Sequence, residues 1–216
     1  MTRPGLRERK KQATREALRE AALRLALERG PDQVRVDDIA AAAGVSPRTY
    51  NNYFASREQA IVAAVTAERE ARVAAAVTAR DELPLAAAVV EAIVEQYTDP
   101  GERGREALVL ITTNPALREA FLGTTAAIEH PLAAAIGSRL RGIDANVAAD
   151  PNGGTDACEL TARVLAAAVV AAIRVALERW VTQTSAPGGF VVVTGSLPEL
   201  LRAALAPLEP ALAAAE

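Results

Sequence analysis

Three polar residues near the start of a short helical segment carry the side chains that read base edges in duplex DNA. Arg48 lies three and four residues before Asn51 and Asn52, so the three side chains share one face of a helix. Arginine offers two donors to guanine O6 and N7, and asparagine pairs with adenine N6 and N7. Their types and spacing therefore predict a base-reading patch.

Two short helices joined by a tight turn would position this patch. Residues 36–43 have apolar side chains at helical spacing, and Gly44 permits a turn directly after them. Ser46 is a good N-cap and Pro47 a good first helical residue, so a second helix begins there. This arrangement is a helix-turn-helix, whose second helix can enter a major groove. An ordinary helical hairpin with a polar face is the alternative interpretation.

The flanking residues support the same interpretation. Tyr50 and Phe54 are four residues apart and are expected to face the core, opposite the polar patch. Ser56 and Gln59 form a capping box at the start of the next helix. Phosphate contacts are expected from Ser46, Thr49, Tyr53 and Arg57.

Charge is distributed unevenly along the chain. The protein has 24 Lys+Arg and 27 Asp+Glu, a net charge of −3. Residues 1–60 hold 12 basic and 8 acidic side chains, a net of +4, and the remainder has a net of −7. A basic segment on an acidic body favours a polyanionic partner, although a solvated charged tail has the same composition. Six basic residues lie in the first fifteen positions: Arg3, Arg7, Arg9, Lys10, Lys11 and Arg15.

Few residues are suited to other chemistry. His130 and Cys158 are single residues of their types, which excludes an internal disulfide, a multi-cysteine zinc site and most histidine-dependent hydrolases. We expect no catalytic residue, metal or cofactor. The N-terminal residues lack the apolar run of a signal peptide, and the apolar stretch at 164–173 is too short to span a bilayer. The expectation is a cytoplasmic protein without a membrane partner.

Helical periodicity dominates the rest of the chain and predicts an all-α protein. An N-terminal three-helix helix-turn-helix domain would precede a C-terminal helical bundle for ligand binding and dimerisation. Residues 190–194 are the exception and are expected to be extended. Helices are expected from Thr14 to Gly30, over 36–43, from Ser46, from Ser56 to about Asp81, over 85–98, 103–113, 115–140 and 156–183, and from Leu197.

The N-terminal part strongly resembles the DNA-binding domain of the tetracycline-repressor (TetR) family. The resemblance covers residues 11–71 and rests on residues 14–18, 28–30, 36–40, 43–46, 49–54 and 56–58. Members of that family are all-α homodimers, usually repressors that leave a double-stranded operator when a small-molecule effector fills the C-terminal domain. The resemblance thus implies a DNA-binding domain at 11–71, with its motif at about 34–53, and a ligand-binding and dimerisation domain at 72–216.

Three positions depart from the family pattern. The family often has Phe at the position of Ala26, Thr at that of Arg35 and Tyr at that of Asn51. Arg35 removes an N-cap but can meet a phosphate, and Asn51 can add a base contact. The full set of expected DNA-contacting residues is Arg35, Ser46, Pro47, Arg48, Thr49, Tyr50, Asn51, Asn52, Tyr53, Ser56 and Arg57.

The C-terminal part is similar to a subgroup related to the mycofactocin regulator, through residues 114–121 and 176–180. Fatty acyl-CoA is a ligand in that subgroup, and the low aromatic content of 3% favours an aliphatic ligand. A bundle interior is a normal place for a pocket. An ordinary packing or surface role is the simpler explanation of each candidate lining residue: Tyr97, Thr112, Phe121, Thr125, His130, Thr161 and Trp180.

The long helix expected at 156–183 is apolar over too wide an arc for the surface of a monomer. It is expected to join a four-helix interface with a second copy of the chain. The expected interface residues are Leu160, Val164, Leu165, Ala168, Ala172 and Val175.

Two other function classes stay open. A helical module that binds a small molecule or a protein partner without an operator would lack the steep salt dependence of DNA binding. An enzyme would need paired acid and base groups in a cleft, and the acidic residues here mostly lie beside arginines at expected helix surfaces.

Overall fold

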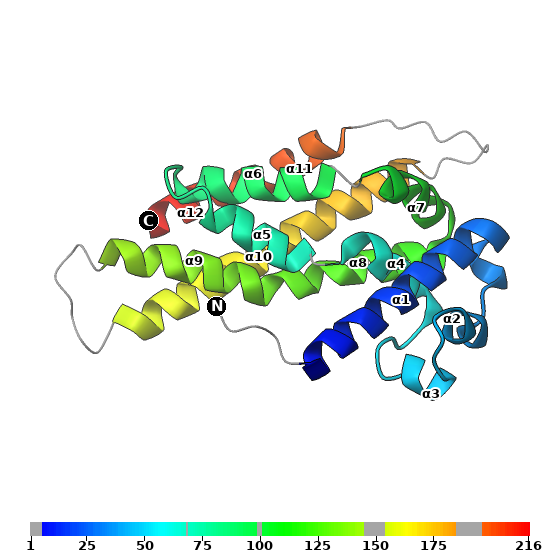
Figure 1. The fold of residues 1–216 in the computed structure, drawn as a ribbon. Coiled ribbons are helices and arrows are strands. Elements are labelled where there is room, and N and C mark those ends of the chain that lie inside the picture. Colours follow the sequence, from blue (N-terminus) through cyan, green and yellow to red (C-terminus); the bar gives the residue numbers. More distant parts are fainter. Residues whose placement is uncertain (1–5, 68, 99–100, 145–153, 185–195) are drawn as a thin grey trace. The chain divides into compact units, whose positions relative to one another are not determined.

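The computed structural model of the chain describes residues 6–67, 69–98, 101–144, 154–184 and 196–216. Within these ranges it contains helices and no strand (Figure 1), which confirms the all-α fold class. Two compact units are present. The head unit comprises Met1–Ala67 and Gly101–Phe121, and the body unit comprises Glu68–Pro100 and Leu122–Glu216. The extended segment expected at 190–194 lies outside the described residues.

The head unit is built around one long helix, α1, which packs against α2, α4 and α7. Its interior is aliphatic and small: Leu18, Ala22 and Leu25 of α1 are buried together with Ile39 and Ile61. The elements of this unit are α1 (Leu6–Arg29), η1 (Pro31–Gln33), α2 (Val36–Ala42), α3 (Pro47–Tyr50), α4 (Arg57–Thr66), α7 (Gly101–Thr113) and most of α8 (Pro115–Gly123).

The body unit is a helical bundle in which α10 packs against α9 and α11, and α6 packs against α5, α11 and α12. Its buried side chains are mostly Ala, Val, Leu and Ile, which have no polar atoms that need hydrogen-bond partners. The elements are α5 (Arg69–Thr78), α6 (Leu85–Thr98), η2 (Thr124–Ile128), α9 (Glu129–Asp144), α10 (Gly154–Thr184), α11 (Leu197–Leu205), η3 (Ala206–Leu208) and α12 (Glu209–Ala215).

Helix α10 divides its apolar residues between two faces. By length and composition alone its segment Asp156–Thr182 could cross a membrane, but 44% of the tested window is buried within this chain. One face packs against α9 and α11 as a core helix does. The other face carries Leu160, Val164 and Val175, which are 63%, 59% and 60% exposed. With Ala167 and Ala171 between them they form a solvent-facing apolar row, here called the α10 stripe.

The expected interface residues are therefore only partly grouped on one surface. Leu160, Val164 and Val175 lie on the α10 stripe, whereas Ala168 and Ala172 are half-buried at its edge. Leu165 is 7% exposed and packs inside its own chain, which corrects its assignment to the interface.

Two long expected helices are interrupted. The helix expected from Ser56 to about Asp81 is divided into α4 and α5, because Ala67 adopts an extended conformation with ψ 136°. This break coincides with the boundary between the two units. The sequence around Ala67 contains neither glycine nor proline, so no local signal marks it.

The helix expected over 115–140 is divided into α8, η2 and α9. Here the sequence does carry a signal, because Pro131 cannot donate an N–H within a helix and fits only its first turn. It lies in the first turn of α9, which begins at Glu129. Helix α1 also differs from expectation, since it begins at Leu6 rather than at Thr14.

Candidate nucleic-acid interface

The turn between α2 and α3 is closed by local backbone contacts. Gly44 has φ 70°, a conformation that glycine adopts without steric cost. The Gly44 amide donates to the carbonyl of Ala41 at 3.1 Å, and the Val45 amide donates to that of Ala40 at 2.9 Å. These bonds fix the direction in which the chain enters α3.

The first turn of α3 is held by the predicted cap. Ser46 is extended, and its Oγ accepts a hydrogen bond from the Thr49 amide at 3.1 Å. The same Oγ lies 2.9 Å from the Thr49 hydroxyl. Such a cap contributes about 1 kcal/mol, which matters for a helix of four residues. Pro47 occupies the first helical position and is exposed.

The inner face of α3 is anchored by two aromatic rings. Tyr50 is fully buried and Phe54 is 2% exposed, as their spacing predicted. Their ring centroids are 5.9 Å apart, and the Tyr50 hydroxyl donates to the carbonyl of Ser56 at 2.8 Å. This burial leaves Tyr50 no surface for DNA, which corrects its place among the DNA-contacting residues. Its role is to hold α3 against the head unit.

The outer face of α3 presents the predicted polar patch. Arg48, Asn51 and Asn52 are all exposed. The Asn51 and Asn52 backbone amides donate to the carbonyls of Pro47 and Thr49, both at 3.1 Å, so both asparagines keep a defined orientation beyond the last helical residue. The neighbouring Tyr53 is half-buried. The structure thus brings together the three side chains expected to read bases.

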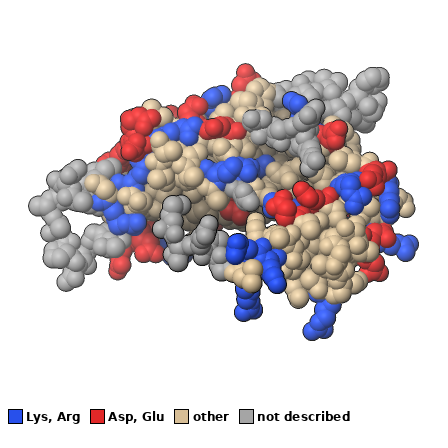
Figure 2. All heavy atoms as spheres, viewed as in Figure 1, with Lys and Arg blue, Asp and Glu red and all other residues tan. Residues whose placement is uncertain are grey.

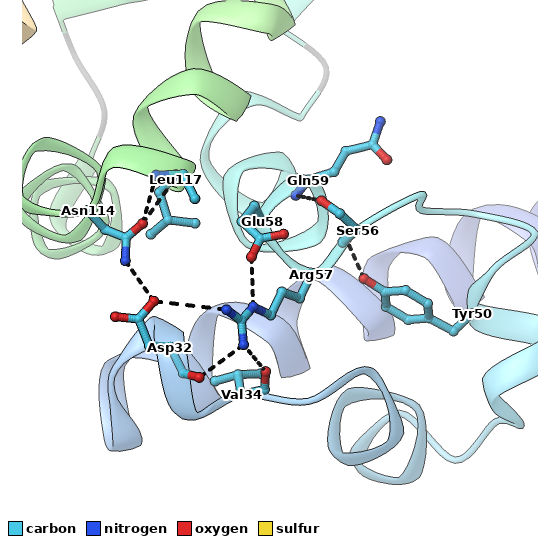
Figure 3. A network of polar contacts seen from close by, with 10 residues as sticks. Asp32, Val34, Tyr50, Ser56, Arg57, Glu58, Gln59, Asn114 and Leu117 are labelled. Carbon is cyan, nitrogen blue, oxygen red and sulfur yellow. Dashed lines mark hydrogen bonds and ion pairs between the residues drawn. The ribbon is translucent and has the colours of Figure 1, made fainter.

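The Arg57 side chain forms its hydrogen bonds within the head unit. Its Nη1 donates to the carbonyls of Asp32 and Val34 at 3.0 and 2.9 Å, and its Nε donates to Glu58 at 2.7 Å (Figure 3). These bonds join the start of α4 to the loop that precedes α2. The guanidinium therefore uses most of its donors within the protein and acts as a positioning residue for the helix-turn-helix.

Asn114 extends this network to the α7–α8 corner. Its Nδ2 donates to Asp32 Oδ1 at 3.0 Å, and Asp32 Oδ1 lies 3.9 Å from Arg57 Nη2 (Figure 3). Its Oδ1 accepts from the amides of Ala116 and Leu117 at 3.0 and 3.1 Å, which caps α8. One amide side chain thus caps a helix and ties it to the loop beside α2.

The capping box at the start of α4 is formed almost as predicted. Ser56 Oγ accepts from the Gln59 amide at 3.1 Å, while Gln59 Oε1 accepts from the amide of Ala55, one residue before the cap. Partial burial acts to raise the pKa of Glu58, but hydrogen bonds from Arg57, its own backbone and Ser56, with the Arg57 charge, lower it overall. Glu58 thus stays ionised, opposite the cation that it orients.

The cap of α2 is absent, as the departure at Arg35 predicted. Arg35 stands at the N-cap position without a side-chain cap bond, and it is exposed. Asp37 and Asp38 in the first turn supply the negative charge that a helix N-terminus favours.

The expected pocket residues are distributed over both units. Thr112 and Phe121 belong to the head unit, while Tyr97, Thr125, His130, Thr161 and Trp180 belong to the body unit. His130 and Thr161 are exposed, and the other five are buried. The hydroxyls of Thr112 and Thr125 donate to the carbonyls of Val109 and Leu122, at 3.0 and 2.8 Å.

Sequence reasoning did not find the polar group at the centre of the body unit. The guanidinium carbon of Arg69 lies 4.3 Å from the centroid of the Tyr97 ring, and both side chains are buried. Burial lowers the pKa of Arg69 and raises the pKa of Tyr97, and the charge and hydrogen bond of Arg69 offset only part of the rise at Tyr97. A first-turn arginine in an amphipathic helix gives no sequence signal of such burial.

We expect Tyr50→Phe to lower the free energy of unfolding by about 1 kcal/mol near neutral pH, because the Ser56 carbonyl loses its donor. Burial, with a contribution from the Glu58 charge, raises the pKa of Tyr50 from 10.0 to about 12. Stability owed to the neutral phenol is therefore present below pH 10 and lost as the pH rises toward 12. Chemical denaturation across that range should show the gap between wild type and variant closing.

The matched control is Tyr53→Phe, which removes a hydroxyl from the neighbouring half-buried ring. A gap between wild type and Tyr50→Phe that stays constant through this pH range would contradict the role assigned to the Tyr50 hydroxyl.

Comparison with known proteins agrees with both parts of this architecture. The family described as bacterial regulatory proteins, tetR family, matches residues 18–64. The MftR C-terminal domain matches residues 83–213, more than half of the chain. A curated relative, the HTH-type transcriptional regulator TcmR of Streptomyces glaucescens, is 42% identical over 64 residues, which are 30% of this chain and 28% of that protein. The chain thus matches less than a third of this relative's length.

Solved structures with a similar fold include FadR of Thermus thermophilus, a TetR-family transcriptional repressor in complex with lauroyl-CoA. It aligns with a TM-score of 0.48 and 22% identity over 91% of this chain and 93% of its own. NalD of Pseudomonas aeruginosa, the secondary repressor of the MexAB-OprM multidrug efflux pump, aligns with a TM-score of 0.45 and 18% identity, over 94% and 96%.

The two domain matches and the helix-turn-helix geometry lead to one conclusion. The chain belongs to the TetR family of bacterial regulatory proteins, with a helix-turn-helix head and an MftR-type C-terminal domain.

Proposed function

We propose that this regulator is a cytoplasmic homodimer that represses transcription from a palindromic operator and is released by a small aliphatic ligand. The observation that carries the proposal is the two-sided structure of α3. One side is locked into the head unit by Tyr50, and the other exposes Arg48, Asn51 and Asn52. In a dimer two such helices would read half-sites ~34–36 Å apart, or a multiple of that.

Base readout is assigned first to Arg48, whose guanidinium can bind guanine in two places. In vitro selection from a random DNA pool, with the purified protein, should recover a palindrome. Arg48→Ala should then weaken binding to that operator by ~1–3 kcal/mol and relax the preference at one base pair in each half-site.

Arg24→Ala is the matched control, because Arg24 is an exposed arginine of the same unit that pairs with Glu28 on α1. It should leave affinity and preference unchanged. A selected sequence without two-fold symmetry, or an Arg48→Ala variant with unaltered preference, would contradict the proposed readout.

We assign the contact with a second copy of the chain to the α10 stripe. In a monomer, this row of apolar side chains on the longest helix would be exposed to water. A two-fold dimer would bury the row against the same row of the second copy. The charged flank formed by Arg163, Arg174 and Glu178 would surround the contact, as polar residues commonly do at interfaces.

Val164→Glu should dissociate the dimer, because it places a carboxylate in the middle of the stripe. Light scattering should show the mass of a monomer, and operator affinity should fall because the two half-sites are no longer bound together. Val109→Glu introduces the same carboxylate at an exposed valine of α7, outside α10, and should leave the dimer intact. A dimeric Val164→Glu variant would exclude this surface.

The effector is assigned to the interior of the body unit, in which Tyr97 and Thr125 are buried. The other buried residues of this unit are almost all aliphatic, which suits an aliphatic ligand. Tyr97 is buried beside the Arg69 guanidinium, whose carbon lies 4.3 Å from the centroid of the tyrosine ring. This pair supplies a cation and a hydroxyl that can bind a polar group of a ligand whose chain fills the aliphatic interior.

Saturated acyl-coenzyme A thioesters of increasing chain length are the probes for this site, with coenzyme A alone as the control. A thioester that binds should raise the melting temperature and release the operator. Tyr97→Phe should bind it about two- to tenfold more weakly, because the variant lacks the hydroxyl that binds the polar group of the ligand. Unchanged thioester affinity in Tyr97→Phe would remove Tyr97 from the site, and no effect of any thioester would exclude this ligand class.

A further inference from the structure

The first three turns of α1 extend beyond the core of the head unit. The first buried side chain of the helix is Leu18, and none of the described side chains from Leu6 to Ala17 is buried. At 1.5 Å per residue these twelve residues extend for ~18 Å. Packing therefore does not account for this part of the helix.

This extension carries a row of cations on one face. Arg7, Lys11 and Arg15 are spaced by four residues, and Lys10 lies beside them. All four are exposed, and none forms an ion pair with a carboxylate among the described side chains. Arginines elsewhere in the structure, such as Arg57, do form such pairs. We call these four residues the α1 cation row.

The cation row opposes the helix that carries it. Positive charge near a helix N-terminus interacts unfavourably with the helix dipole, and like charges four residues apart repel one another. The dipole effect acts on Arg7 in the first turn, and the repulsion acts on the pairs Arg7–Lys11 and Lys11–Arg15. A polyanion that bound along this face would reverse both, because it would place negative charge where the helix favours it.

The cation row leads toward the base-reading helix. The guanidinium carbon of Arg15, the last member of the row, lies over the ring of Phe54 at 5.6 Å from the centroid, and Phe54 lies four residues after the end of α3. Figure 2 shows basic side chains at the start of α1 and over α3 that project from the same side of the head unit. Through Arg15, the row therefore reaches the segment that follows α3 within the same unit.

We propose that Arg7, Lys10, Lys11 and Arg15 form a second DNA-contacting surface, which binds backbone phosphates beside the half-site that α3 reads. The proposal rests on the proposed function, because it assigns the duplex to α3. Phosphates bound by this row carry no sequence information, so the row adds affinity and salt dependence but no base preference.

The test compares two variants that each remove two cations from α1. Arg7→Gln with Lys11→Gln removes two cations of the row, whereas Arg9→Gln with Arg24→Gln removes two exposed arginines of the same helix that are not members of the row. Glutamine keeps the helix propensity close to that of the residues replaced. Binding of the full-length protein to the selected operator and to an unrelated duplex is measured by fluorescence anisotropy between about 50 and 200 mM salt.

We expect the row variant to reduce the slope of log K against log salt by about 2, on both duplexes, because each lost phosphate contact contributes about 0.9. The selected base preference should stay the same. The control variant should keep the wild-type slope. If both variants lost the same amount of slope, the effect would come from the overall positive charge of the helix and not from the row. Unchanged slopes in both variants would show that the row does not contact DNA.

These outcomes separate the two proposals. If the wild type binds DNA without any base preference and the row variant still loses slope, the readout by α3 is wrong and the cation row stands. If operator binding is sequence-selective but insensitive to the row variant, the reverse holds. Binding to vesicles of anionic phospholipid that depends on the row, with DNA binding unaffected, would overturn the proposal in favour of a membrane surface.

Discussion

The orientation of the exposed face of α3, which we propose reads bases, depends on the burial of Tyr50. A helix of four residues has no stability of its own, so α3 takes its position from what its inner face contacts. The Tyr50 ring packs beside Phe54, and its hydroxyl ties the end of α3 to the carbonyl of Ser56 at the start of α4. Helix α4 in turn packs along α1. The position of the exposed Arg48 side chain therefore depends on the packing of α4 against α1.

Arg57 forms its hydrogen bonds within the head unit, although sequence analysis predicted that it contacts phosphate. Its bonds to the carbonyls of Asp32 and Val34 fix the loop before α2, and Asn114 extends the network to α8. The chain passes between the two units at 67–68, 100–101 and 121–122. Within the head unit, the Asn114 bond thus joins the α7–α8 corner to the loop that precedes α2.

Local rules predicted much of the head unit and little of its long-range polar contacts. The Ser46 cap, the turn at Gly44 and the burial of Tyr50 follow from residue type and spacing within a few positions. The bond between Asp32 and Asn114 joins residues 82 positions apart, and no periodicity encodes it. The break after Ala67 also has no local sequence signal, because the surrounding alanine-rich sequence favours an unbroken helix.

Charge on α1 has a geometric consequence for the head unit. The cation row lies on the face of α1 that, from Leu18 onward, becomes the buried face with Ala22 and Leu25, since these positions continue the same three- and four-residue spacing. A rotation of α1 cannot move the cations without also moving the core residues. The packing that holds α4 and α3 therefore also fixes the direction of the cations, and a chain with a net charge of −3 presents local positive charge beside its base-reading helix.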